Sequence, residues 1–116
     1  MIIVYHNPKC RKSRAGLEYV KQHDPSAIVV EYIREGITME DVQKLISMLG
    51  IRPFDLVRTQ EEYYRENLKD QNPSDEEWYK ILAGNPKLIR RPVVVSNGKA
   101  VLADPPEKAG IFFDNH

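Results

Sequence analysis

The chain has 116 residues, of which 41% are hydrophobic and 29% are charged, a composition typical of one ordinary globular domain. Lysine and arginine together number 17, as do aspartate and glutamate, so net charge provides no general attraction to nucleic acid or to a membrane. No apolar run approaches the roughly 18–20 residues that cross a bilayer. The N-terminus also lacks the pattern of a signal peptide, so we expect a cytoplasmic protein.

The first third of the sequence has the pattern of a β-α-β unit. Residues 2–5 are a short run of strand-forming apolar residues that ends before Pro8. Apolar residues at helical spacing follow in residues 14–23, and a second strand is predicted over residues 28–32. Two strands joined by a helix in this way favour a parallel pair with a right-handed crossover.

The middle of the chain is predicted to be helical. Two stretches carry capping boxes, in which a hydroxyl side chain and an acidic side chain three residues later bond each other's backbone N–H groups: Thr38 with Asp41, and Ser74 with Glu77. Pro53 suits the first turn of a further short helix. Residues 60–72 are rich in charge, and we expect them on the surface.

The last part of the chain has the pattern of a hairpin and a short helix. Asn97-Gly98 lies between two apolar runs, and this dipeptide is the strongest short hairpin signal. Pro105-Pro106 then begins a terminal helix. The resulting order, β-α-β, helices and β-β-α, predicts an α/β thioredoxin-like fold of the glutaredoxin type with a helical insertion, in a single domain over residues 1–116.

Cys10 is the only cysteine, and it lies between the first predicted strand and the first predicted helix. The N-terminus of a helix stabilises anions, including a thiolate. Positive charge that lowers a thiol pKa is expected from neighbouring side chains, namely His6, Arg11, Lys12 and Arg14. Ser13 can donate a hydrogen bond to the sulfur or to a bound oxyanion. A buried structural cysteine is the alternative, but these neighbours argue against an apolar environment.

Three further features are ambiguous when taken alone. Pro92 could be an edge feature of the third strand, but in a thioredoxin-like fold it matches the cis-proline that faces the nucleophile. Arg91 would then point into the site. Arg58 follows an apolar helical turn, and by itself it is typical of a surface residue. The three histidines have no metal-ligand spacing, so we expect no metal site.

The motif Tyr5-His6-Asn7-Pro8-x-Cys10-x-x-Ser13-Arg14 strongly resembles that of the ArsC family of glutaredoxin-coupled arsenate reductases and their close relatives. The likeness continues through Leu56-Val57-Arg58 and through residues 88–95, so it covers nearly the whole chain. The resemblance implies a thioredoxin-like fold with a helical insertion. It also implies no bound cofactor, with glutathione and glutaredoxin as the external reductant and as partners.

The resemblance further implies roles for individual residues. Cys10 would be the nucleophile that attacks the arsenic of arsenate, and His6 would help to keep its thiol ionised. Ser13 would lie in the loop around the oxyanion, and Pro92 would be the cis-proline. Oxyanion binding would fall to four arginines: Arg11, Arg14, Arg58 and Arg91.

The sequence departs from the family pattern at one place. Besides the two clamping arginines that match Arg58 and Arg91, the arsenate-reducing members have a third, which precedes a proline shortly after the hairpin, where this chain has Ala103-Asp104. A second hypothesis is therefore an ArsC-like thiol protein that acts on another substrate, such as glutathione mixed disulfides. A third is an Spx-type transcriptional regulator. Such regulators typically sense oxidation through Cys-x-x-Cys, and Cys10 with Ser13 cannot form that disulfide.

Overall fold

The computed structural model describes residues 1–113, so the last three residues of the predicted single domain lie outside the described part of the chain. The chain forms two compact units, one made of Met1–Glu35 with the chain from Arg91 onward and the other of Gly36–Arg90. The second unit corresponds to the predicted helical insertion. This division into two units does not test the prediction that residues 1–116 form a single domain. No helix within residues 1–113 is long and apolar enough to cross a membrane.

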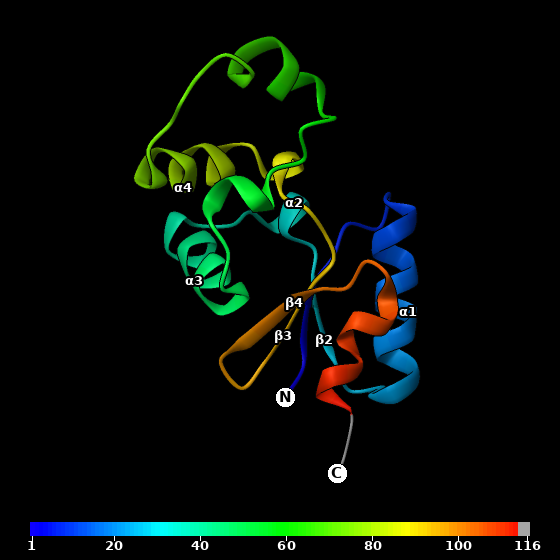
Figure 1. Cartoon of the computed structure of the whole chain (residues 1–116). Coiled ribbons are helices and arrows are strands. Elements are labelled where there is room, and N and C mark those ends of the chain that lie inside the picture. Colours follow the sequence, from blue (N-terminus) through cyan, green and yellow to red (C-terminus); the bar gives the residue numbers. More distant parts are fainter. Residues whose placement is uncertain (114–116) are drawn as a thin grey trace. The chain divides into compact units, whose positions relative to one another are not determined.

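The first unit is built on a four-stranded mixed sheet (Figure 1). Its strands are β1 (Ile3–Tyr5), β2 (Ile28–Val30), β3 (Val93–Ser96) and β4 (Lys99–Leu102), in the spatial order β2-β1-β3-β4. β1 pairs with β2 in parallel and with β3 antiparallel, and β3 pairs with β4 antiparallel. This topology confirms the predicted thioredoxin-like frame.

Helix α1 (Arg11–His23) and the terminal 3₁₀ helix η4 (Pro106–Phe112) pack against each other beside the sheet (Figure 1). The small side chains of Ala109 in η4 and of Ala103 in the segment before it are fully buried, and their size allows this close packing. They join a core with Val4 of β1, Val20 of α1 and Val94 of β3. The terminal helix is therefore confirmed, but as a 3₁₀ helix.

The second unit consists of helices and turns. Its two longer helices, α3 (Met39–Leu49) and α4 (Asp75–Gly84), contact each other. Both predicted capping boxes are confirmed, with reciprocal bonds between the hydroxyl side chain, the acidic side chain and the two backbone N–H groups in each. The helices bury apolar side chains of the faces predicted by their spacing, among them Val42, Leu45, Trp78 and Leu82.

Two short helical turns in this unit are tied together by their flanking backbone. η1 (Pro53–Leu56) is followed by Val57, and η3 (Pro86–Leu88) is followed by Ile89, which forms an isolated antiparallel bridge with Val57. The N–H of Arg58 donates to the carbonyl of Leu88 at 2.7 Å. The backbone at Arg58 is therefore held in place by a segment that is distant in sequence.

The prediction that the second strand continues through Glu31 and Tyr32 is wrong. Helix α2 (Tyr32–Glu35) begins there instead, with the N–H groups of Arg34 and Glu35 donating to the carbonyl of Glu31. The Glu35 carboxylate also accepts the N–H of Glu31 at 2.9 Å. Tyr32 is fully buried in this conformation, so tertiary packing overrides the strand preference of its aromatic side chain.

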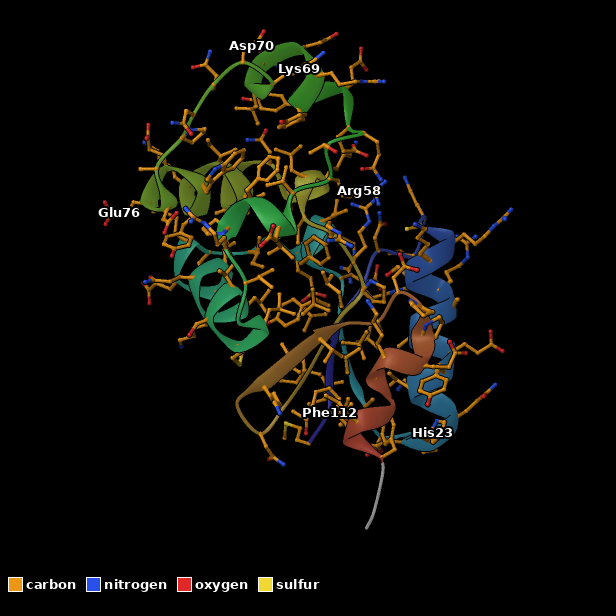
Figure 2. All side chains as sticks on the ribbon, in the orientation of Figure 1. His23, Arg58, Lys69, Asp70, Glu76 and Phe112 are labelled. Atoms are coloured by element: carbon orange, nitrogen blue, oxygen red, sulfur yellow. The ribbon has the colours of Figure 1, made fainter. Side chains whose placement is uncertain are left out.

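Residues 60–72 contain a helical turn that the sequence did not predict. η2 (Tyr64–Leu68) is a π-helix, a rare conformation that no charge or hydropathy pattern signals. Most of the segment is exposed as expected, and Figure 2 shows Lys69 and Asp70 projecting beyond the end of η2. The hairpin turn, by contrast, is confirmed, because Asn97 and Gly98 both have positive φ, at 50° and 76°.

Gly16 allows α1 to approach the loop before β3. A Cβ at this position would lie 2.4 Å from Cγ of Pro92 and 3.2 Å from the carbonyl oxygen of Ala103. The first distance is far below van der Waals contact, so a side chain here would push the helix away from the loop. Helix α1 and the loop at Pro92 are thus held at a spacing that only glycine permits.

We therefore expect Gly16→Ala to lower the free energy of unfolding by about 1–3 kcal/mol, as overpacking in a close contact does. Chemical denaturation measures this. Gly84→Ala is the matched control, because a Cβ there meets nothing within 4 Å. It should leave stability unchanged or raise it by up to about 1 kcal/mol, since alanine has the higher helix propensity. Equal effects of the two substitutions would contradict the close contact.

Candidate active site

Cys10 is the N-cap residue of α1, with extended backbone angles of φ −102° and ψ 123°. The helix begins at Arg11, three residues earlier than predicted. The N–H of Cys10 donates to the carbonyl of Asn7 at 3.1 Å, and the carbonyl of Cys10 accepts the N–H of Arg14 at 2.9 Å. The half-buried thiol therefore lies at the end of the helix where free N–H groups and the positive end of the dipole favour an anion.

The environment of Cys10 lowers the pKa of its thiol. Burial raises the pKa, but the backbone N–H of Ser13, the guanidinium of Arg91 and the backbone N–H of Lys12 together outweigh that effect. These donors stabilise the thiolate by hydrogen bonding and, in the case of Arg91, also by charge. The thiol is therefore more ionised near neutral pH than an ordinary cysteine, which makes it a better nucleophile.

The hydroxyl of Ser13 is used inside the loop. Ser13 is fully buried, and its Oγ accepts the N–H of Asn7 at 2.9 Å and lies 2.8 Å from Nδ1 of His6. We predicted that this hydroxyl bonds the sulfur or a bound oxyanion; instead it makes two bonds that hold the start of the loop against the first turn of α1. Ser13 contacts the thiol through its backbone N–H instead.

The protonation of His6 follows from these bonds. Ser13 Oγ accepts the N–H of Asn7, and its own proton can be donated to Nδ1 of His6 when that nitrogen is unprotonated. Burial lowers the pKa of the His6 ring; the Glu31 charge and a hydrogen bond to the backbone of Ser13 raise it, and Arg14 lowers it further, with a net lowering. His6 is thus neutral near pH 7, and it acts on the loop through hydrogen bonding rather than through a positive charge.

Arg91 and Pro92 lie in the same unit as Cys10. The peptide bond between them is cis, the conformation expected for a proline at this position of the fold. The Arg91 side chain belongs to a residue that is only 9% exposed, and its interaction with the thiol is one of those that lower the Cys10 pKa. The structure therefore brings together Cys10, His6, Ser13 and Arg91.

The other predicted arginines have different surroundings. Arg11 and Arg14 are exposed on the first turn of α1, and Arg14 donates to the carbonyl of Pro8 at 2.9 Å. Arg58 belongs to the helical unit (Figure 2) and is mostly buried, contrary to its surface-like sequence context. It pairs with Glu61 at 3.4 Å, while its buried Nε has no hydrogen-bond partner among residues 1–113.

Sequence reasoning named Asn7 and Lys12 but missed the contacts that they make around the Cys10 loop. Asn7 shapes the turn, because its Oδ1 accepts the N–H of Lys9 at 3.1 Å and its carbonyl accepts the N–H of Cys10. An asparagine directly before a proline is a known turn signal, so this role was open to prediction. Lys12 pairs with Asp104 at 3.2 Å, and no local pattern links two residues so distant in sequence.

We also searched the described residues for a cavity and for a metal-binding cluster. A hollow of about 340 Å³ lies in the helical unit between η1, η2 and α4, with aromatic walls from Phe54, Tyr64 and Trp78. No predicted site residue lines it. Within residues 1–113, no group of three or more His, Cys, Asp or Glu side chains is placed to hold a metal ion.

A thioredoxin-like frame that carries a lone cysteine at the N-cap of its first helix and a cis-proline before its third strand defines a thiol protein of the thioredoxin-like class. Comparison with known families gives the finer assignment. The model of the ArsC family matches residues 5–112, and the chain belongs to the ArsC family.

Several relatives align over almost the whole chain. The uncharacterized protein YfgD of Escherichia coli K12 is 39% identical over 109 residues, which is 90% of each chain. A protein named arsenate reductase from Haemophilus influenzae is 32% identical over 108 residues and covers 91% of this chain and 93% of its own length. The solved structure of an arsenate reductase from Vibrio cholerae is 36% identical, with a TM-score of 0.89 over 97% of both chains.

Loss of the Arg91 guanidinium should make Cys10 less reactive. Arg91→Met removes a charge and a hydrogen bond that favour the thiolate, so we expect the Cys10 pKa to rise. The rate of alkylation by iodoacetamide at neutral pH should then fall by about threefold to tenfold, with a smaller fall for the charge-conserving Arg91→Lys. Arg90→Met is the control. An unchanged rate in Arg91→Met would show that this guanidinium does not act on the sulfur.

The buried His6 should make stability depend on pH. Its pKa is lower in the folded than in the unfolded chain, so the unfolded chain binds the proton more readily as the pH falls through the ordinary histidine range. The contribution that the neutral His6 makes to the free energy of unfolding at neutral pH is therefore lost in mild acid. His6→Asn keeps an acceptor for Ser13 but does not titrate, so its free energy of unfolding should fall less than that of the wild type.

Chemical denaturation at neutral and mildly acidic pH measures this difference. His23→Asn is the matched control, because His23 is an exposed histidine on the same helix as Ser13. An identical acid-induced loss of stability in the wild type and His6→Asn would contradict the neutral, hydrogen-bonded His6.

Proposed function

We propose that this protein is a thiol-dependent oxyanion reductase of the arsenate reductase type, with Cys10 as the nucleophile and with glutathione and glutaredoxin as the external reductant. One observation carries the proposal: the thiol of Cys10, in a chain of the ArsC family, has a lowered pKa because the first N–H groups of α1 and the Arg91 guanidinium favour its anion. An anion site beside a nucleophilic thiolate suits an attack on an oxyanion.

Two external thiols supply the two electrons that reduce arsenate to arsenite. The Cys10 thiolate forms a bond to arsenic(V) while an As–O bond breaks, and that oxygen leaves as water after taking up protons. A first glutathione thiolate attacks Sγ of Cys10, and the electron pair of the S–As bond passes to arsenic, which leaves as arsenite. A second thiol, from glutathione or glutaredoxin, attacks the glutathione sulfur of the mixed disulfide and releases Cys10 as its thiolate.

External thiols are required because the chain has no second cysteine. Residues 10 and 13 cannot form a disulfide, and the buried Ser13 instead holds the loop through His6 and Asn7. This arrangement favours a reductase over a regulator that senses oxidation through an internal Cys-x-x-Cys pair. We expect the reaction to take place in the cytoplasm, where glutathione is reduced.

Cationic side chains have separate roles in this proposal. Arg91 stabilises both the thiolate and the bound oxyanion, because it is in the Cys10 environment. Arg11 and Arg14, on the first turn of α1, add positive charge for the approach of an anion. Arg58 lies in the other unit, and its assignment to the oxyanion rests on the family resemblance alone.

A second candidate function is the reduction of glutathione mixed disulfides. The Asp104 carboxylate near the start of α1 favours it, because a carboxylate opposes the binding of a multiply charged anion. The same Cys10 thiolate would attack the glutathione sulfur of the disulfide and release the partner thiol, and a further glutathione would then restore Cys10.

Arsenite formation from arsenate in the presence of glutathione and glutaredoxin tests the main proposal. Cys10→Ser should abolish arsenite formation, and Arg91→Lys should lower kcat/KM by about tenfold or more, because a lysine cannot replace a bidentate guanidinium. Arg65→Lys, a change at an exposed position of η2, is the matched control and should retain wild-type activity.

Two results would contradict the proposal. Arsenite formation by Cys10→Ser at the wild-type rate would remove the nucleophile from the mechanism. Rapid reduction of a glutathione mixed disulfide by the wild type, with no arsenite formed from arsenate, would favour the second candidate.

A further inference from the structure

The first turn of α1 carries an ion pair whose side chains take no part in the proposed bond-making steps. Nζ of Lys12 lies 3.2 Å from Oδ2 of Asp104, with the side chains 64% and 35% exposed. Lys12 is two residues from Cys10, and its backbone N–H is one of the groups that lower the Cys10 pKa. The side-chain charge of Lys12, which would otherwise add to the positive potential at this helix end, is thus paired with a carboxylate.

The position of Asp104 is fixed by its neighbours. The preceding residue, Ala103, is fully buried, and its N–H donates to the carbonyl of Pro92 at 3.0 Å. Pro92 lies against α1 at Gly16. Arg91, which precedes Pro92 in the sequence, interacts with the thiol. Asp104 therefore follows directly on a backbone that is bonded to the Arg91-Pro92 segment of the Cys10 site.

A carboxylate in this place acts on substrates according to their charge. It weakens the attraction of the helix end for anions, and by Coulomb's law the penalty for a doubly charged anion is twice that for a singly charged one. A neutral substrate is not penalised. Because both side chains are partly exposed, solvent screens the effect, which makes it a bias among substrates rather than a block.

We propose that Asp104 is a specificity-determining residue of the Cys10 site. By pairing with Lys12 it reduces the positive charge next to the nucleophile and biases the site against doubly charged oxyanions, in favour of singly charged or neutral substrates. This inference rests on the proposed function only in taking Cys10 as the attacking atom.

Two alkylating reagents of different charge test the inference without any turnover of arsenate. Iodoacetate is an anion, iodoacetamide is neutral, and both alkylate only the thiolate of Cys10. The ratio of their rates therefore cancels the ionised fraction of the thiol and reports the potential that an approaching anion meets. Asp104→Asn should raise the iodoacetate to iodoacetamide ratio by about two- to fourfold at low ionic strength, and salt should diminish the gain.

Two further variants make the test specific. Lys12→Met should change the ratio in the opposite direction, because it removes the positive partner and leaves the carboxylate. Glu107→Gln removes an exposed carboxylate from the neighbouring turn of η4, and the wild-type ratio is expected.

An unchanged or lowered ratio in Asp104→Asn would overturn the inference, and so would an equal rise in Glu107→Gln. The thermal midpoint of each variant checks that it is folded. If arsenate is not reduced at all, the proposed function fails, but the alkylation ratio still decides whether Asp104 sets the charge preference of Cys10.

Discussion

The chemistry assigned to this protein depends on one interaction, the stabilisation of the Cys10 thiolate where α1 begins. Burial opposes the charged sulfur, and the free N–H groups of the first turn and the Arg91 guanidinium overcome that opposition. The rest of the first unit holds these donors in place. β1 leads directly into the Cys10 loop, β3 follows the cis bond at Pro92, and Gly16 lets the helix meet that segment closely.

The loop itself is held by buried hydrogen bonds rather than by charge. His6, Asn7 and Ser13 are all buried, and the Ser13 hydroxyl joins the other two. A buried network of this kind is stabilising only when every member is satisfied, which explains why a small hydroxyl and a neutral imidazole occupy these positions. The positive charge comes from Arg91 and the N-terminus of α1. The residues that fix the conformation of the loop are therefore different from the groups that stabilise the thiolate by charge.

The sequence predicted much of this frame and the central residue, for physical reasons that can be stated. Capping boxes, the Asn97-Gly98 turn and the strand pattern are local signals, and the structure confirms them except at the end of the second strand. The start of α1 was predicted late because its polar first turn has no apolar periodicity. The conformation at Tyr32 was predicted wrongly, because a short sequence window does not show that this side chain is buried. The Lys12–Asp104 ion pair was missed, because such a window does not show pairing between distant residues.

The Cys10 thiol is ionised more readily than that of an ordinary cysteine. Titration of the thiolate absorbance in the ultraviolet, with Cys10→Ser as the blank, measures this on the single cysteine of the intact chain. We expect a midpoint clearly below that of a free cysteine measured under the same conditions. A midpoint at or above the free-cysteine value would contradict it, since the helix end and Arg91 would then fail to offset burial.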